Sequence, residues 1–76
     1  MRSDADILGS NIKQLRKSKD LTQVEMAMLL KIGVGSLRKL ERGIIPPRMS
    51  IDVLYHAYTA FGILPSRLFV ETDEIG

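Results

Sequence analysis

Residues 21–43, LTQVEMAMLLKIGVGSLRKLERG, contain two short helical patterns separated by a turn that includes glycine. Thr22 is followed three residues later by Glu25, a capping-box pattern in which each side chain can bond the backbone N–H of the other residue. This pattern predicts a helix from Gln23 to Leu30. A further helix at about residues 33–42 ends at a glycine, the residue that most readily adopts the left-handed conformation found after many helices.

The turn itself, KIGVGS at residues 31–36, places two glycines on either side of a valine. Such a stretch can be a phosphate-binding loop, a plain loop or the start of a helix. No strand pattern precedes it and no Gly-Lys-Ser/Thr follows it, which excludes the phosphate-binding loop. Gly33 falls at the helix cap, where glycine costs roughly a few tenths of a kcal/mol relative to serine. Gly35 falls in the first turn, where glycine costs about 0.5–1 kcal/mol relative to alanine.

Outside this stretch, three more helices are predicted. The first covers about residues 5–18, with a weak capping signal from Ser3. Its apolar positions repeat at i, i+4 and i+7 and are Leu8, Ile12 and Leu15. Two prolines break the helical pattern after residue 43, Ser50 can cap a fourth helix, and Pro65 suits the first turn of a short fifth one. No strand signal or repeat occurs, so the fold class is all-α.

Composition limits the chemistry available to the 76 residues. The sequence contains no cysteine and one histidine, which excludes a disulfide framework and a zinc site made by this chain alone, and no cofactor is expected. No apolar run has the length of a signal peptide or a membrane span, so we expect a cytoplasmic protein. Nine basic and three acidic residues lie between Lys13 and Arg48, a pattern typical of proteins that bind polyanions, although a solvated basic surface is the simpler alternative.

The stretch from Leu21 to Gly43 resembles the helix-turn-helix of the Cro/cI phage-repressor family, also called the xenobiotic-response-element family. The resemblance rests on the Leu-Thr-Gln opening, Ala27 and the Glu-Arg-Gly ending. It extends over about residues 7–69. It implies a compact, five-helix, lambda-repressor-like domain at residues 1–70, followed by a short acidic tail at 71–76.

The resemblance also implies a function and a set of site residues. The helix at 33–42 would enter the major groove of double-stranded DNA, and a homodimer would place two such helices about one helical turn apart. Lys39 is the best candidate for a base contact. The full set of expected DNA-binding residues is Gln23, Val34, Gly35, Ser36, Arg38, Lys39, Arg42 and Arg48. In the family an arginine of the first helix pairs with the glutamate before Arg-Gly, here Arg16 and Glu41; the alternative is two separate surface charges.

The sequence departs from the family pattern in three places. Lys31 stands where the family usually has glycine, so either Lys31 adopts a strained left-handed conformation or the turn is reshaped around Gly33. Val34 and Gly35 replace polar residues that often contact bases, so direct readout would be limited. The helix at 23–30 is apolar nearly all round, which suggests a protein interface. The residues of this expected interface are Val24, Met28, Leu29, Ile44 and Ile45.

Two functions remain open at this point. The first is a DNA-binding transcriptional regulator of prophage or bacterial type that acts as a homodimer on a two-half-site operator. The second uses the same fold as a protein-interaction module or a weakly specific nucleic-acid accessory protein. An enzyme is disfavoured, because His56 has no partner at a spacing that would make it a catalytic base.

Overall fold

The computed structural model describes residues 3–45 and 51–71. The helices in these ranges are α1 (Asp4–Ser18), α2 (Gln23–Leu30), α3 (Val34–Glu41), α4 (Ile51–Phe61) and α5 (Pro65–Leu68). The described residues include no strand, which confirms the prediction of an all-α domain. Ser50, the predicted cap of the fourth helix, lies outside the described residues. Within them, no helix combines the length and the apolar composition needed to cross a membrane.

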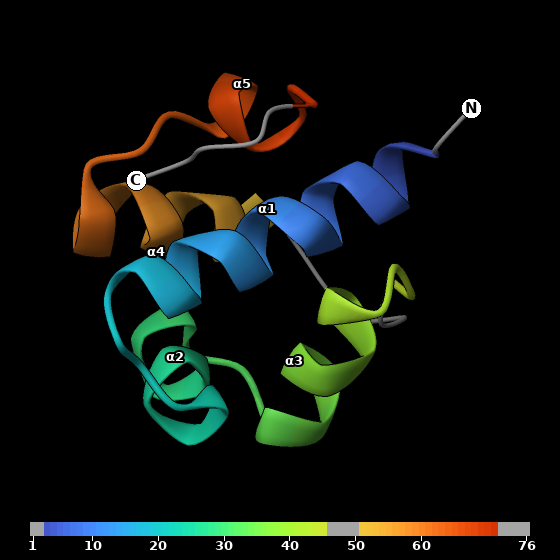
Figure 1. The fold of residues 1–76 in the computed structure, drawn as a ribbon. Helices are drawn as coiled ribbons and strands as arrows, with labels where there is room; N and C mark the ends of the chain where they lie inside the picture. Colours follow the sequence, from blue (N-terminus) through green and yellow to red (C-terminus); the bar gives the residue numbers. More distant parts are fainter. Residues whose placement is uncertain (1–2, 46–50, 72–76) are drawn as a thin grey trace.

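Helix α1 occupies the middle of the domain and packs against α3 on one side and α5 on the other, while α2 packs against α3 and α4 (Figure 1). The predicted fifth helix begins at Pro65 as expected and ends at Leu68, with Phe69 as its exposed C-cap residue.

Side-chain caps fix the first turns of α1 and α2. The Ser3 hydroxyl accepts from the Asp6 N–H at 3.1 Å, and the Thr22 hydroxyl accepts from the Glu25 N–H at 3.1 Å. The Glu25 carboxylate accepts in return from the Thr22 N–H at 2.8 Å. The backbone N–H and the hydroxyl of Thr22 together lower the pKa of Glu25. Both capping boxes read from the sequence are therefore formed.

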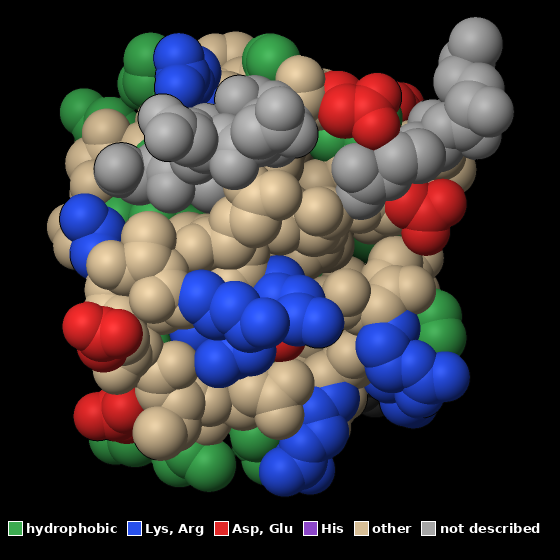
Figure 2. Space-filling view, viewed as in Figure 1, with side chains coloured by type: hydrophobic (Ala, Val, Ile, Leu, Met, Phe, Trp, Pro, Cys, Tyr) green, Lys and Arg blue, Asp and Glu red, His purple; other side chains and the backbone are tan. Residues whose placement is uncertain are grey.

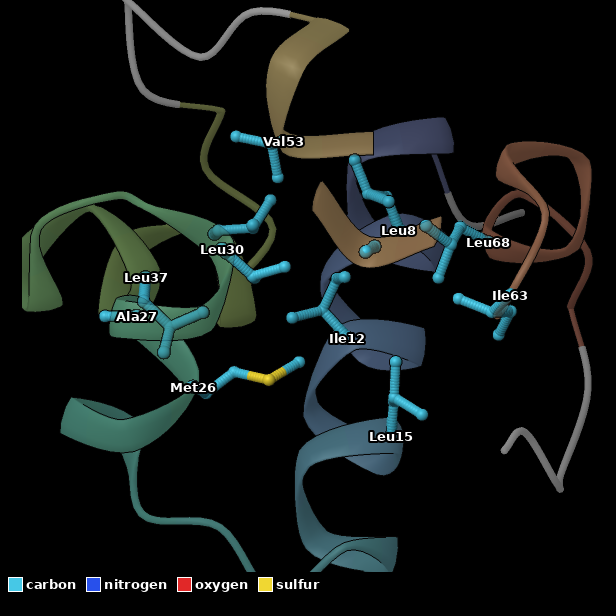
Figure 3. Close-up of a cluster of buried hydrophobic side chains, with 12 residues drawn as sticks. Leu8, Ile12, Leu15, Met26, Ala27, Leu30, Leu37, Val53, Ile63 and Leu68 are labelled. Carbon is cyan, nitrogen blue, oxygen red and sulfur yellow. The ribbon is translucent and has the colours of Figure 1, made fainter. Parts of the chain in front are cut away.

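One cluster of apolar side chains joins the helices. Figure 3 shows Met26 and Leu30 of α2 directed toward Ile12 of α1, while Leu68 and Ile63 reach α1 from the opposite side. The fully buried apolar residues are Leu8, Ile12, Leu15, Met26, Ala27, Leu30, Leu37, Leu40, Val53, Ala57, Ile63 and Leu68. Leu21 and Ile32 are partly buried and pack against this core.

Two buried residues of α1 determine how closely its neighbours approach. A Cβ built on Gly9 would overlap the carbonyl oxygen of Leu40 and lie 3.1 Å from the Gly43 nitrogen, so only glycine lets α3 come this near. The Asn11 side chain, 2% exposed, donates to the carbonyl oxygens of Leu68 at 2.7 Å and Val70 at 2.9 Å. Helix α1 thus positions α3 through Gly9 and α5 through Asn11.

Candidate nucleic-acid interface

The turn between α2 and α3 keeps the family geometry without the family glycine. Lys31 adopts the left-handed conformation at φ 58°, and Gly33 has an ordinary φ of −70°. The N–H groups of Lys31 and Ile32 donate to the carbonyls of Met28 at 3.2 Å and Ala27 at 3.0 Å, which satisfies the end of α2. The chain therefore tolerates the strain at Lys31 and does not reshape the turn around Gly33.

Helix α3 begins without help from a side chain. Gly33 is its N-cap and provides no capping hydrogen bond, and Gly35 follows in the first turn. A Cβ built on either glycine would meet nothing within 4 Å. Packing inside the domain therefore does not require glycine at either position.

The outer side of α3 carries positive charge. Helical geometry aligns Gly35, Lys39 and Arg42 at i, i+4 and i+7, opposite the buried pair Leu37 and Leu40. Lys39, Arg42 and the flanking Arg38 are exposed. Val34 and Ser36 are half-buried, and Val34 packs against the core. Arg48, the remaining basic residue expected at this interface, lies outside the described residues.

Arg16 of α1 and Glu41 of α3 form a largely buried ion pair. The Arg16 Nε donates to Glu41 Oε2 at 2.7 Å and its NH2 group donates to Oε1 at 3.1 Å, a bidentate arrangement. The two side chains are 13% and 3% exposed. The NH1 group of Arg16 also donates to the Leu21 carbonyl at 3.0 Å. This pair joins α1, α3 and the start of α2 and neutralises the carboxylate of Glu41.

Gln23 connects this pair to the exposed side of α3. Its Nε2 donates to Glu41 Oε1 at 3.2 Å, and its Oε1 accepts from the Nε of Arg38 at 3.3 Å. The amide oxygen is thus engaged inside the protein, whereas the amide nitrogen carries a second N–H that can still donate to another group. Arg38 is held on the side of α3 that faces α1 and the start of α2.

A hollow of about 610 Å³ lies between α1 and α3. Its lining contains five basic side chains and one acidic side chain: Lys13, Arg16, Lys17, Arg38, Arg42 and Glu41, together with Gln23. Figure 2 shows basic side chains gathered over the gap between α1 and α3 and along α3, with acidic side chains toward the margins of this face. Lys13 and Lys17 belong to this surface but were not among the residues expected to bind DNA. Their i, i+4 spacing on α1 was the signal that could have identified them.

Apolar side chains on α2 are exposed, as the sequence pattern indicated. Val24 is 54% exposed, Met28 71% and Leu29 41%. Ile44 and Ile45, which follow the end of α3, are also exposed. All five residues of the expected protein interface are therefore exposed, and the interface itself stays a prediction.

A second apolar surface, absent from the sequence predictions, lies between α4 and α5. A hollow of about 530 Å³ there is lined by Asp52, Leu54, Tyr55, Tyr58, Leu64 and Pro65. Tyr55, Tyr58 and Leu64 are exposed. The helical spacing of apolar residues in α4 places Ala57 inside the core. The two nearby tyrosines give no sign in the sequence of this hollow, because the turn before α5 forms part of its wall.

Comparison with known proteins agrees with this geometry. Residues 9–74 match the model of a protein family described as a helix-turn-helix domain. The chain belongs to this helix-turn-helix family. The family resemblance read from residues 21–43 is thereby confirmed, and α2, the turn at Lys31 and α3 are its helix-turn-helix. No solved structure matches the chain.

This helix-turn-helix domain also resembles part of a curated protein. Over 37 residues, 49% of the chain, it is 49% identical to Antitoxin PezA of Streptococcus pneumoniae serotype 4. The matched segment spans 23% of the length of that protein.

Proposed function

We propose that this protein is a DNA-binding transcriptional regulator that inserts α3 into the major groove. The observation that carries the proposal is the charge of the outer side of α3 and the adjoining hollow. Lys39, Arg42 and Arg38 are exposed there, and Glu41, the one acidic residue among the described residues that line the hollow, is 3% exposed and paired with Arg16. A DNA backbone would meet positive charge with no uncompensated negative charge.

The side chains of α3 would have different tasks. Lys39, in the middle of the outer stripe, would donate to the O6 and N7 atoms of a guanine. Arg42 would contact a phosphate and fix the register of the helix without reading sequence, a role that the family pattern also suggests for Arg48. The backbone at Gly35 would pass close to the base edges, with Ser36 and Val34 at the sides of the helix and Val34 touching a thymine methyl group.

Gln23 would contribute through its second amide N–H. Because the first is engaged by Glu41, the side chain is already oriented at the N-terminus of α2. A phosphate at this position would accept from the remaining N–H and would also be stabilised by the helix dipole.

We further propose that the protein acts as a homodimer on an operator with two half-sites. A single α3 offers few side chains that can read bases, so one copy would discriminate sequences weakly. Two copies related by a two-fold axis would place their α3 helices about 34–36 Å apart, one turn of DNA. Operator symmetry would then supply the specificity that one reading helix lacks.

The likeness to an antitoxin does not extend this proposal to toxin neutralisation. The shared segment covers less than a quarter of that protein, so its name bears on the chain only through those 37 residues. We therefore limit the proposal to DNA binding and regulation.

Selection of bound sequences from a random DNA pool tests the proposal. We expect an enriched two-fold symmetric motif with half-sites one helical turn apart, bound at least about 10³-fold more tightly than competitor DNA. Replacing Arg38 and Lys39 together with alanine should abolish this preference, whereas Arg67→Ala, an exposed arginine on α5, should preserve it. Absence of any enriched motif, with unselective binding, would contradict a sequence-specific regulator.

A second candidate function, a protein-interaction module, is favoured by the exposed apolar side of α2. Val24, Met28 and Leu29 cover a helix surface that family members usually make polar, and exposed apolar patches commonly mark interaction sites. Analytical sedimentation of the wild type and of Met28→Glu across a wide concentration range tests this function. The protein-interaction module would be favoured over the DNA-binding regulator by two results together: the wild type shows no preference among DNA sequences, and it self-associates or binds a partner in a way that Met28→Glu abolishes.

A further inference from the structure

Lys13 and Lys17 form a basic pair on the exposed side of α1. They are one helical turn apart, so their side chains leave the same face of the helix. Both are exposed and both line the hollow between α1 and α3, opposite Arg38 and Arg42. Four basic side chains from two helices therefore surround one concave surface.

The only acidic group that the described residues contribute to this hollow is neutralised by its partners. Glu41 would repel an anion if it were free, but Arg16 binds both of its carboxylate oxygens and Gln23 donates to one of them. Gln23 also accepts from Arg38 and so restricts that side chain to the rim of the hollow. The remaining charge of the surface is that of Lys13, Lys17, Arg38 and Arg42, and it is available to a ligand.

With α3 in the major groove, the hollow would face one sugar-phosphate backbone of the duplex. An α-helix with its side chains is about 10–12 Å across, close to the roughly 12 Å width of the major groove. A helix in the groove therefore brings the surfaces immediately beside it against the sugar-phosphate backbones. The hollow lies directly beside α3, on the side of α1.

We propose that the hollow between α1 and α3 is a binding site for DNA backbone phosphates, with Lys13 and Lys17 as its principal ligands together with Arg38. The inference rests on the proposed function, because it assumes that α3 enters the major groove. It assigns Arg38 to the backbone and leaves Lys39 as the long basic side chain that reads bases. It also makes α1, outside the helix-turn-helix, a part of the DNA-binding surface.

Salt titration of Lys13→Gln, Lys17→Gln and the double variant tests this assignment. Each lost phosphate contact should reduce the magnitude of the slope of log K against log salt by about 0.9. The double variant should lose about 1.8, and affinity should fall by a similar factor on selected and unrelated DNA. Arg67→Gln, on the exposed surface of α5, is the matched control and should leave the slope unchanged. An unchanged slope in the double variant would overturn the inference.

Duplexes that carry a single uncharged phosphate identify which phosphate Lys13 and Lys17 contact. In a selected duplex, each phosphate in turn is replaced by an uncharged methylphosphonate, and binding is measured for the wild type and for Lys13→Gln/Lys17→Gln. One or two positions beside the half-site should weaken binding of the wild type but affect the double variant little, because the partner of the phosphate is already gone. Fully additive effects at every position would refute the proposed contact.

The same measurements separate the inference from the proposed function. If the wild type shows no DNA binding at any salt concentration, both are wrong. If the wild type binds selectively, loses that binding on replacement of Arg38 and Lys39, and is indifferent to Lys13 and Lys17, only the phosphate site on α1 is wrong. Circular dichroism of the two lysine variants should match the wild type, since both side chains are exposed.

Discussion

Helices α2 and α3 have the same length, eight residues each, but they differ in how they are held and in what they expose. Helix α2 begins with the capping box of Thr22 and Glu25, and its outer side is apolar. Helix α3 begins at Gly33 with no side-chain cap, and its outer side is basic.

The difference shows that α3 depends on its surroundings more than α2 does. The first turn of α2 is stabilised by residues within the helix itself. The position of α3 depends on α1, through the close approach at Gly9 and the ion pair of Arg16 and Glu41. Changes in α1 should therefore disturb α3 before they disturb α2.

The largest effect is expected from Arg16→Ala. This change strands the Glu41 carboxylate, which is 3% exposed, and should lower the free energy of unfolding by about 3–5 kcal/mol. In a domain of this size that equals most of the net stability, so thermal unfolding followed by circular dichroism should show a partly unfolded variant at 25 °C.

The double variant Arg16→Met/Glu41→Leu is the control for this prediction. It removes both charges and keeps apolar volume, so it should recover much of the lost stability. If Arg16→Ala is as stable as the wild type, the pair of Arg16 and Glu41 contributes no more than a surface ion pair. The position of α3 would then not depend on this pair.

Gly9→Ala should produce the next largest effect. The added methyl group would overlap the Leu40 carbonyl and force α1 and α3 apart, at a cost of about 1–3 kcal/mol. Chemical denaturation measures this cost. Gly35→Ala is the matched control, because its Cβ would meet nothing within 4 Å. Equal effects of the two substitutions would show that the contact between α1 and α3 is not tight.

The sequence alone predicts the structural features that depend on residues close together in the chain. Ser3 with Asp6 and Thr22 with Glu25 are three residues apart, and both capping boxes form. Asp20, just after α1, adopts the left-handed conformation at φ 55°, which aspartate tolerates better than most residues. The helix-turn-helix was recognisable for the same reason, since its pattern lies within 23 consecutive residues.

The features that sequence could not supply depend on contacts between distant residues. Gly9 is required by the carbonyl oxygen of Leu40, which lies against α1 only in the folded chain. Asn11 gave no signal that its amide would bond the end of α5. Lys13 and Lys17 were noticed as part of a basic cluster, but only the fold places them beside Arg38.

A matched pair of cap substitutions should give smaller effects of opposite sign. Thr22→Ala removes the cap of α2 and should destabilise the domain by about 1 kcal/mol, whereas Gly33→Ser adds a hydroxyl to the uncapped start of α3 and should stabilise it by roughly a few tenths of a kcal/mol. Thermal unfolding of both variants checks the signs. If Gly33→Ser has no effect, the start of α3 does not lack a cap in solution.

The pH dependence of stability offers a further test of the capping box of α2. Because the capping box lowers the pKa of Glu25 in the folded state, its contribution is present at neutral pH and is lost as the pH falls through that lowered pKa. The backbone N–H of residue 22 remains in Thr22→Ala, so the variant that tests the carboxylate is Glu25→Gln. The difference in free energy of unfolding between wild type and Glu25→Gln should narrow below about pH 4, near the ordinary pKa of a glutamate. A constant difference down to pH 2 would exclude the carboxylate from the cap.

Gly35→Ala should change stability only slightly, and its effect on DNA binding is the more informative measurement. Alanine favours the helix by about 0.5–1 kcal/mol and meets no neighbour inside the domain, so the melting temperature should rise by about 2–8 °C. If the α3 backbone lies against base edges, the same methyl group should weaken binding to selected DNA while leaving unselective binding intact. A stabilised variant that binds its selected site as tightly as the wild type would place Gly35 away from the bases. Sequence discrimination would then have to come from Lys39, Ser36 and Val34, and the absence of a side chain at position 35 would have no role in recognition.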